Sequence, residues 1–424
     1  MLDTHNKQHI SVLGLGVAED ALLSEQAICA LAQADLVIGS ARQLQTLSKL
    51  LGSQKTALLP KLAQLKVLIE SAQNVLILGS GDPLYYGIGT WISKQFSEAN
   101  VQFFPAVSSL TQACHCLGFA QQDMNVVSLH GRPLAKLKVA LKAQQTLLLL
   151  TDKHSQPQHI AAVCVETGFN DAQIIVCERL GYTEQKISTF SVLQLIESPQ
   201  CFDTLHVTFV VCGNNQGYLP TFPGIKDEHF ETGELGAKGM ITKREVRLAI
   251  LSLLQLQKND LVWDIGAGCG GVAVELAYWQ PLARIYAIEH NEKRFDCLQQ
   301  NQQKFGVVSN LIPTFGRAPA VLSELSELPH ANKIFIGGSD GELPTLLDSL
   351  WQGLPEGGQI VVSAVMEQTK FQCFDFYRQR AEQDDCCSET LQIAINKGAT
   401  LAGQLIYRPA LPVNLFSFIK RSVS

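Results

Sequence analysis

The sequence has few charged residues, few aromatic residues and no long apolar run. Charged residues make up 17% and aromatic residues 7% of its 424 positions, whereas about 25% of a typical domain is charged. The net charge of −6 gives no basic footprint for a nucleic acid, and aliphatic runs such as Leu147–Leu150 are far too short to span a membrane. We therefore expect neither a nucleic-acid nor a membrane partner, and two or three domains with large apolar cores.

The twelve cysteines lack the spacing of a metal site. No CxxC pair is present, and the close pairs, Cys114-x-Cys116 and Cys386-Cys387, do not have metal-finger spacing. The first residues, Met1–Lys7, lack the apolar core of a signal peptide. These features predict reduced thiols, no bound metal and a cytoplasmic protein.

Apolar segments of strand length alternate with helix-like segments along the first half of the chain. The expected strands are Ile10–Leu13, Leu36–Gly39, Val75–Leu78, Val101–Phe104, Thr146–Leu150, Ile174–Val176 and His206–Val211. The alternation predicts an α/β fold. Between Gly213 and Gly239 the period is lost and prolines appear, which is typical of a stiff connector. We expect a first domain at 8–213, a linker at 214–238 and a second domain at 239–424.

The second domain contains the most informative segment, a strand followed by a glycine-rich turn. The apolar run Leu261–Trp263 ends in Asp264, and a helix-like segment follows the turn. The turn contains Gly266, Ala267, Gly268, Cys269 and Gly270. Such a turn lets a ligand approach main-chain N–H groups at a helix N-terminus. A second strand, Ile285–Ile288, ends in Glu289, which is placed to accept both hydroxyls of a ribose. The pattern predicts an adenosine-containing ligand.

Two ligands compete for this turn. Gly266-x-Gly268-x-x-Gly271 also matches the dinucleotide fingerprint. The negative charge of Asp264 would repel the pyrophosphate of a dinucleotide, whereas it is compatible with the cationic S-adenosylmethionine (SAM). An ordinary turn without a ligand is the third interpretation.

The end of the chain favours SAM. Strand-like segments at Glu389–Asn396 and Asn414–Arg421 are joined by a loop that contains Gly403 and Pro409. A terminal hairpin fits the seven-stranded sheet of SAM-dependent methyltransferases, whereas a dinucleotide-binding fold would end in parallel units.

Two segments of the first half combine glycine with residues that hold a loop in a fixed shape. Gly79–Gly87 follows a strand, and Pro83 keeps Asp82 extended. Ser108 and Ser109 precede a helix and predict either an N-cap or a ligand contact. For the glycine segment the alternatives are an ordinary strand-end turn and a ligand loop with exposed backbone groups.

Basic side chains beside loops and helix ends suit an acidic substrate. His130 and Arg132 flank a glycine, and a surface loop is the simpler interpretation of this group. Arg179 follows another strand, and a surface ion pair is the simpler interpretation of its side chain. Thr242 and Glu245 predict a capping box at the start of a helix. The first turn of that helix carries Lys243, Arg244 and Arg247, which are placed to bind carboxylates. Gly316–Pro319 and Ile334–Ser339 lie at strand ends, where ligands bind in open α/β sheets.

Together these motifs resemble two families of cobalamin synthesis. The first half resembles the tetrapyrrole methylases through Gly14-Leu-Gly16, Ala34–Arg42, Gly81–Gly87, Ser108-Ser109 and Ser128–Arg132. The second half resembles their partner methyltransferase through Thr242–Arg247, Trp263–Gly270, Ala287–Glu289, Gly316–Pro319 and Ile334–Gly338. The order of the halves is similar to that of the fused, decarboxylating C(5,15)-methyltransferases.

The resemblance implies a fold and a reaction. It implies a tetrapyrrole methylase fold of two α/β subdomains, followed by a Rossmann-like class I SAM-dependent methyltransferase with a terminal β-hairpin. The first half would methylate C-5 of a precorrin, a small-molecule tetrapyrrole. The second half would methylate C-15 and decarboxylate the C-12 acetate arm. A homo-oligomer is expected, and no catalytic residue is assigned.

The resemblance also implies which residues bind. For SAM in the first half they are Gly14, Gly16, Gly81, Asp82, Pro83, Tyr86, Ser108 and Ser109. For SAM in the second half they are Thr242, Asp264, Gly266, Ala267, Gly268, Cys269, Gly270, Glu289, Gly316, Arg317 and Ala318. The candidates for the substrate carboxylates are Arg42, His130, Arg132, Lys243, Arg247 and Arg317.

Two positions depart from the family pattern. Val17–Asp20 replaces a Pro-Gly after the first loop, and Cys269 replaces a small Ser or Thr. Two other functions remain open on the sequence. One is an NAD-dependent dehydrogenase that uses the 266–271 loop. The other is a regulatory SAM-binding module in which one half has lost its activity.

Overall fold

The computed structural model describes residues 8–198, 200–233, 241–324 and 330–422, which fall into two compact units. The first unit contains Met1–Arg132 and Leu141–Asn215, and the second contains Pro133–Ala140 and Gln216–Ser424. The expected second-domain start at 239 and the linker residues 234–238 lie outside the described residues. None of the helices in the described ranges is long and apolar enough to cross a membrane.

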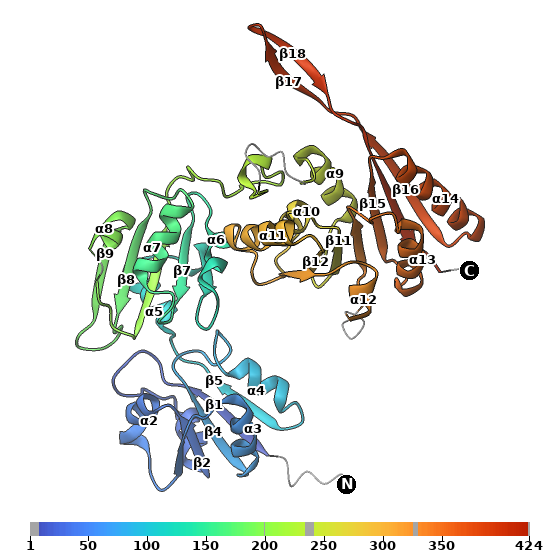
Figure 1. The fold of residues 1–424 in the computed structure, drawn as a ribbon. Helices are drawn as coiled ribbons and strands as arrows, with labels where there is room; N and C mark the ends of the chain where they lie inside the picture. The colour runs from blue at the N-terminus through green and yellow to red at the C-terminus, as the bar shows by residue number, and fades with distance from the viewer. Residues whose placement is uncertain (1–7, 199, 234–240, 325–329, 423–424) are drawn as a thin grey trace, which may run out of the picture. The chain divides into compact units, whose positions relative to one another are not determined.

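The first unit contains two five-stranded sheets (Figure 1). The first sheet is parallel, in the order β3-β2-β4-β1-β5. Its strands are β1 (His9–Gly14), β2 (Leu36–Gly39), β3 (Lys55–Leu58), β4 (Asn74–Gly79) and β5 (Asn100–Phe104). The helices are α1 (Glu25–Gln33), α2 (Ala41–Leu47), α3 (Leu62–Glu70) and α4 (Gly89–Gln95). The central strands are continuous apolar runs because they are buried on both faces.

The second sheet of this unit is mixed, in the order β6-β7-β10-β8-β9. Its strands are β6 (Met124–Ser128), β7 (Thr146–Leu150), β8 (Gln173–Glu178), β9 (Lys186–Ser191) and β10 (His206–Val211). The helices are α5 (Ser109–Leu117), α7 (Pro157–Glu166) and α8 (Val192–Glu197), and the short α6 (Leu137–Ala140) belongs to the second unit. Only β6 and β7 pair in parallel. The seven strands expected in the first half are all present, and β3, β6 and β9 were missed because their sequences are partly exposed and polar.

The second unit contains the seven-stranded sheet that the sequence predicts, in the order β13-β12-β11-β14-β15-β19-β16. Its strands are β11 (Leu261–Ile265), β12 (Arg284–Glu289), β13 (Leu311–Phe315), β14 (Lys333–Ile336), β15 (Gln359–Ala364), β16 (Cys386–Ile393) and β19 (Val413–Lys420). The first five are parallel, and β19 pairs antiparallel with both β15 and β16. This antiparallel end is the feature that separates the fold from a dinucleotide-binding one.

Among the described residues, six α-helices accompany this sheet and bury an apolar core against it. They are α9 (Arg244–Leu254), α10 (Gly271–Trp279), α11 (Glu292–Lys304), α12 (Ala320–Glu324), α13 (Leu343–Gly353) and α14 (Glu367–Gln383). The capping box expected for α9 is wrong, because the helix begins at Arg244 with Lys243 as a cap that makes no side-chain hydrogen bond. Glu245 instead pairs with Arg244 and Lys397.

The sequence predicts a loop between the last two strands of the sheet. This prediction is wrong, because the segment forms a two-stranded antiparallel ribbon. Strands β17 (Asn396–Leu401) and β18 (Gln404–Pro409) pair antiparallel. Ala402 and Gly403 both have positive φ, as a two-residue hairpin turn requires. In Figure 1 the ribbon extends beyond the ends of β16 and β19, away from the sheet.

Part of the expected linker packs on the second unit as a strap, which we define as residues 216–230. Its Leu219, Ile225 and Phe230 are buried, and a short 3-10 helix (Asp227–His229) precedes its end. Glu275 of α10 accepts hydrogen bonds from the backbone N–H groups of Gly224 and Ile225, at 2.8 and 3.0 Å. The strap is therefore part of the second unit and not a free connector.

Candidate functional site

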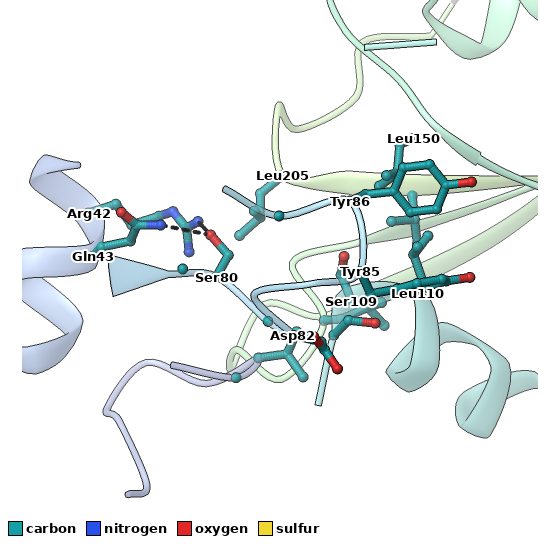
Figure 2. Close-up of a pocket in the computed structure, with 18 of the residues that line it drawn as sticks. Arg42, Gln43, Ser80, Asp82, Tyr85, Tyr86, Ser109, Leu110, Leu150 and Leu205 are labelled. Atoms are coloured by element: carbon teal, nitrogen blue, oxygen red, sulfur yellow. Dashed lines mark hydrogen bonds between the residues drawn. The ribbon is translucent and has the colours of Figure 1, made fainter. Parts of the chain in front are cut away.

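The first cavity, of about 510 Å³, lies beside the Gly79–Gly87 loop of the first unit (Figure 2). Asp82 Oδ1 accepts a hydrogen bond from the Leu84 N–H at 2.8 Å, and the Tyr86 hydroxyl donates to the Val126 carbonyl at 3.1 Å. Tyr86 has a φ of 56°, which a tyrosine rarely adopts. Backbone strain of this kind clusters at ligand loops, and a ligand-binding role for this loop stays a prediction.

Close backbone crossings explain the small residues of this cavity. A Cβ on Gly14 would lie 2.1 Å from the Gly81 carbonyl oxygen, and one on Gly81 would lie 2.7 Å from Ser108 Cα. Ser108 caps α5, since its hydroxyl accepts from the Thr111 N–H at 3.1 Å. The N-cap interpretation of Ser108 is therefore correct, and Ser108 also faces the cavity.

The structure brings most of the predicted residues of the first half together. Gly16, Arg42, Gly81, Asp82, Tyr86, Ser108, Ser109 and His130 line the cavity. Gly14, Pro83 and Arg132 are not among the lining residues, and Gly14 supports the loop crossing.

Contacts across this cavity join loops that are far apart in the sequence. Arg42 donates to the Ser80 hydroxyl at 2.9 Å and to the Tyr182 hydroxyl at 3.4 Å (the Ser80 bond is drawn in Figure 2). The Val17–Asp20 segment, which differs from the family pattern, is also anchored. Its Glu19 carboxylate accepts hydrogen bonds from the backbone N–H and the hydroxyl of Thr183, at 3.3 and 3.1 Å. Tyr182 and His206 line the cavity, and no local sequence pattern indicated them.

The second cavity, of about 570 Å³, lies at the carboxyl ends of the parallel strands of the second unit. Glu289 lines it and is almost fully buried. The Glu289 carboxylate accepts hydrogen bonds from the backbone N–H groups of Gly268, His290 and Asn291, at 2.8, 2.9 and 2.8 Å. Because a carboxylate offers about four acceptor positions, capacity remains for a ligand hydroxyl.

The glycine turn is as tight as the sequence predicts. A Cβ on Gly266, whose φ is 70°, would lie 2.7 Å from the backbone of Gly338, and one on Gly270 would lie 2.4 Å from Leu298. Thr242, Lys243, Gly266, Ala267, Gly268, Glu289, Gly316, Arg317 and Ala318 line the cavity. Cys269, Gly270 and Asp264 are not among its lining residues.

Asp264 is a buried carboxylate without a counter-charge. Its side chain has no exposed area, and neither oxygen receives a hydrogen bond of normal geometry among the described residues. Burial, with a further contribution from the negative charge of Glu289, raises the pKa of Asp264 to about 7. The region beneath the glycine turn therefore favours a positively charged ligand.

Four ionisable residues from three strand-end loops, Arg317, Asp340, Glu342 and His290, form a cluster beside the second cavity. The Asp340 carboxylate lies 3.3 Å from His290 Nε2 and 3.6 Å from Arg317 Nε, and Arg317 also pairs with Glu342 at 3.2 Å. Asp340 has a φ of 48°. His290 and Asp340 line the cavity and were missed because their partners are distant in sequence.

Arg247, expected to bind a substrate carboxylate, has a different role. Its side chain has no exposed area, and its guanidinium lies 2.7 Å from Asp227 and 3.0 Å from Glu275. It also donates to the carbonyls of Thr242 and Ile225. Arg247 therefore stabilises the strap, whereas Lys243 lines the cavity, 3.9 Å from Asp227.

Both cavities are large enough for a small-molecule cofactor. Their volumes lie in the range of small-molecule sites, about 300–1,000 Å³. In the second cavity the residues present fit the ribose of SAM, because Glu289 offers an acceptor for its hydroxyls. In the first cavity the fit rests on the close-packed glycine loop.

Comparison with known proteins gives two family matches along the chain. A model described as "Tetrapyrrole (Corrin/Porphyrin) Methylases" matches residues 9–195, and one described as "Precorrin methyltransferase domain" matches residues 235–420. The precorrin-6Y C(5,15)-methyltransferase [decarboxylating] of a Sinorhizobium species is 29% identical over 97% of this chain and 96% of its own length. The probable cobalt-precorrin-6B C(15)-methyltransferase (decarboxylating) of Pyrobaculum aerophilum is 33% identical over 46% of this chain and 95% of its own length.

Solved structures also match. The crystal structure of precorrin-6y C5,15-methyltransferase from Geobacter metallireducens GS-15 is 32% identical, covers 46% of this chain and 98% of its own chain, and has a TM-score of 0.42.

Proposed function

We propose two separate SAM sites for this chain, which belongs to the family of precorrin-6Y C(5,15)-methyltransferases (decarboxylating). One site is the first cavity, with the Gly79–Gly87 loop, and the other is the second cavity, with the Gly266–Gly270 turn and Glu289. The observation that carries the proposal is the presence of two unlike glycine-rich cavities, one within each unit. An expected cytoplasmic location stays a prediction.

The enzyme methylates a precorrin at two carbons and removes one carboxyl group, as the full-length relatives are named to do. SAM supplies an electrophilic methyl group on a sulfonium, and an electron-rich carbon of the reduced macrocycle is the nucleophile. The chain therefore contributes mainly positioning and exclusion of water. We assign C-5 methylation to the first unit, and C-15 methylation with loss of carbon dioxide to the second. The dehydrogenase interpretation finds no support among the relatives.

Arg42 in the first cavity, and Lys243 and Arg317 in the second, are the proposed contacts for the carboxylates of the macrocycle, and His130 lines the first cavity together with Arg42. Arg317 is paired with Asp340 and Glu342, so a substrate carboxylate has to compete with them for it.

Replacing Glu289 by alanine should weaken SAM binding at the second site only. Two ribose hydroxyls lose their acceptor, which costs about 1–3 kcal/mol, or about 5- to 150-fold in Kd. Isothermal titration calorimetry of the full native chain should find two SAM sites. In the variant, the first site should keep its native Kd and the second should have a higher Kd. Glu292→Ala, an exposed glutamate in the first turn of α11, is the matched control and should leave both sites unchanged. One site in the native chain, or equal binding by the Glu289 variant, would contradict the assignment.

The β17–β18 ribbon is the surface that we propose joins copies of this chain. Its Leu405 and Tyr407 are 71% and 69% exposed, although a two-stranded ribbon is only marginally stable by itself in water. A second copy that covers these side chains would bury their apolar area.

Leu405→Glu combined with Tyr407→Glu should reduce the assembly to a smaller species, because charges would be buried at the contact. Light scattering after gel filtration measures the mass, and Gln404→Glu, beside them in β18, should keep the native mass. A native chain that elutes as a monomer would refute this surface.

A further inference from the structure

Two histidines line the first cavity, and they differ in what their ring nitrogens contact. His206 Nδ1 lies 2.6 Å from the Asp203 carbonyl, and His206 Nε2 lies 2.9 Å from the Thr151 hydroxyl. His130 Nδ1 lies 3.3 Å from the Thr151 carbonyl. Because a carbonyl only accepts, Nδ1 carries the proton in both neutral rings. Both nitrogens of His206 are thus used, whereas Nε2 of His130 has no partner among the described residues.

The other groups of this cavity are poor bases near neutral pH. The Asp82 carboxylate is already engaged, since its Oδ1 accepts a hydrogen bond from the Leu84 N–H at 2.8 Å. Burial raises the pKa of the Cys177 thiol to about 12, and burial also raises the pKa of Tyr85, so both groups stay protonated. His130 is exposed at the rim, where an abstracted proton can pass to solvent.

The reaction requires a base in this cavity if, as proposed above, the first unit methylates C-5. That carbon carries one hydrogen in a conjugated system, and it gains a methyl group. Restoring the conjugation requires that the hydrogen leave as a proton.

We infer that His130 is the general base of the first site, and that its Nε2 removes the proton from the newly methylated carbon. In this step the carbon–methyl bond forms as the sulfur–methyl bond breaks. The carbon–hydrogen bond then breaks, its electron pair returns to the macrocycle, and the proton goes to Nε2. The His130 imidazolium that results releases its proton to water.

The neighbouring charges are compatible with this role. The loop of His130 is held by Asp152, whose carboxylate accepts from the Gly131 N–H at 2.7 Å. Hydrogen bonds from the backbone N–H groups of Gly131 and His154 lower the pKa of Asp152 to about 2, so Asp152 holds this loop as a carboxylate. The remaining titratable and charged groups that line the cavity are Arg42, Asp82, Tyr85, Tyr86, Cys177, Tyr182 and His206.

Histidine nitrogen NMR on the full chain tests the protonation state without any reaction. In ¹⁵N-histidine-labelled protein at pH 8, the His130 signals should show a protonated Nδ1 and an unprotonated Nε2, with assignment by loss of signal in His130→Gln. A ring protonated on Nε2 would overturn the inference. The protonation state is read from the native protein, and the variant serves only to assign the signals.

Kinetics test the role itself. His130→Gln should bind SAM with unchanged affinity and lose about 10²–10⁴ in C-5 methylation rate, with the acidic limb of the pH–rate profile removed. His130→Ala should recover part of its rate in added imidazole, because the cavity is open at its rim; a structural role would not be rescued. His159→Gln, on the exposed face of α7, is the control and should retain the native rate.

The outcomes separate this inference from the proposed function. A native chain that transfers no methyl group to C-5 refutes the proposed function. A native chain that does so, beside a His130→Gln variant of equal rate and pH profile, refutes only the base.

Discussion

Replacing Glu275 by glutamine should destabilise the second unit by about 3–5 kcal/mol, the usual cost of removing one partner of a buried ion pair. Arg247 and Glu275 both have fully buried side chains, and their charges face each other at 3.0 Å. The substitution leaves the Arg247 charge with Asp227 alone, and it weakens the acceptor of two strap N–H groups.

Tryptophan fluorescence during urea unfolding measures this effect in the full chain. Trp263, Trp279 and Trp351 belong to the second unit, so a Trp91→Phe background reports on that unit alone. The matched control is Glu367→Gln, which removes an ion pair between the exposed Glu367 carboxylate and Lys370 and should cost no more than about 1 kcal/mol. Equal unfolding midpoints for Glu275→Gln and Glu367→Gln would contradict the role given to the buried pair.

The same contacts predict where the chain can be divided. A fragment of residues 216–424 keeps Asp227 and the Ile225 carbonyl beside Arg247, whereas a fragment of residues 239–424 loses both. The longer fragment should therefore unfold at clearly higher urea. Equal midpoints would mean that the strap adds nothing, and that the boundary expected at 239 suffices.

Replacing Asp264 by asparagine should remove a pH-dependent cost to the stability of the ligand-free second unit. The folded-state pKa of Asp264 is raised to about 7 by burial, while the unfolded value is about 4. The folded chain therefore holds more protons between these values, and native stability falls as pH rises from about 4 to about 7. The asparagine variant lacks this term, so its unfolding free energy relative to the native chain should rise by up to about 4 kcal/mol between pH 4 and pH 8.

The Asp264→Asn variant should gain stability relative to the native chain as the pH rises to 8, but it should bind SAM more weakly at the second site. The proposed ligand is cationic, and the variant lacks the negative charge beneath the turn, so the Kd of the second site should rise about tenfold at pH 8. Asp348→Asn, on the exposed face of α13, should change neither property. A pH-independent difference in stability between the Asp264 variant and the native chain would show that Asp264 is ionised in the folded protein.

The parts of the fold and site that the sequence predicts are those with a local signal. The glycine turn directly follows strand β11, and Glu289 ends the next strand, β12, which pairs with β11. Residue types alone therefore place these features together. The Gly79–Gly87 loop is of the same kind. Such features depend on backbone geometry that glycine and proline impose within a few residues.

The missed features depend on partners that are distant in the chain. Arg247 looked like a surface arginine in the first turn of a helix, because its partner Glu275 lies 28 residues away in sequence. A signal was present, since Glu275 is the one charged residue of the otherwise apolar segment Gly271–Trp279. The β17–β18 ribbon was missed because it is exposed and has no buried face to produce an alternating pattern.

The central claim is that one chain adds two methyl groups to a precorrin and removes one carboxyl group. The most direct test incubates the full chain with excess SAM and precorrin-6Y, and follows product mass and released carbon dioxide together. We expect each product molecule to gain two methyl groups and lose one carbon dioxide, with two molecules of SAM consumed. An unchanged substrate mass in the presence of folded, SAM-binding protein would contradict the account.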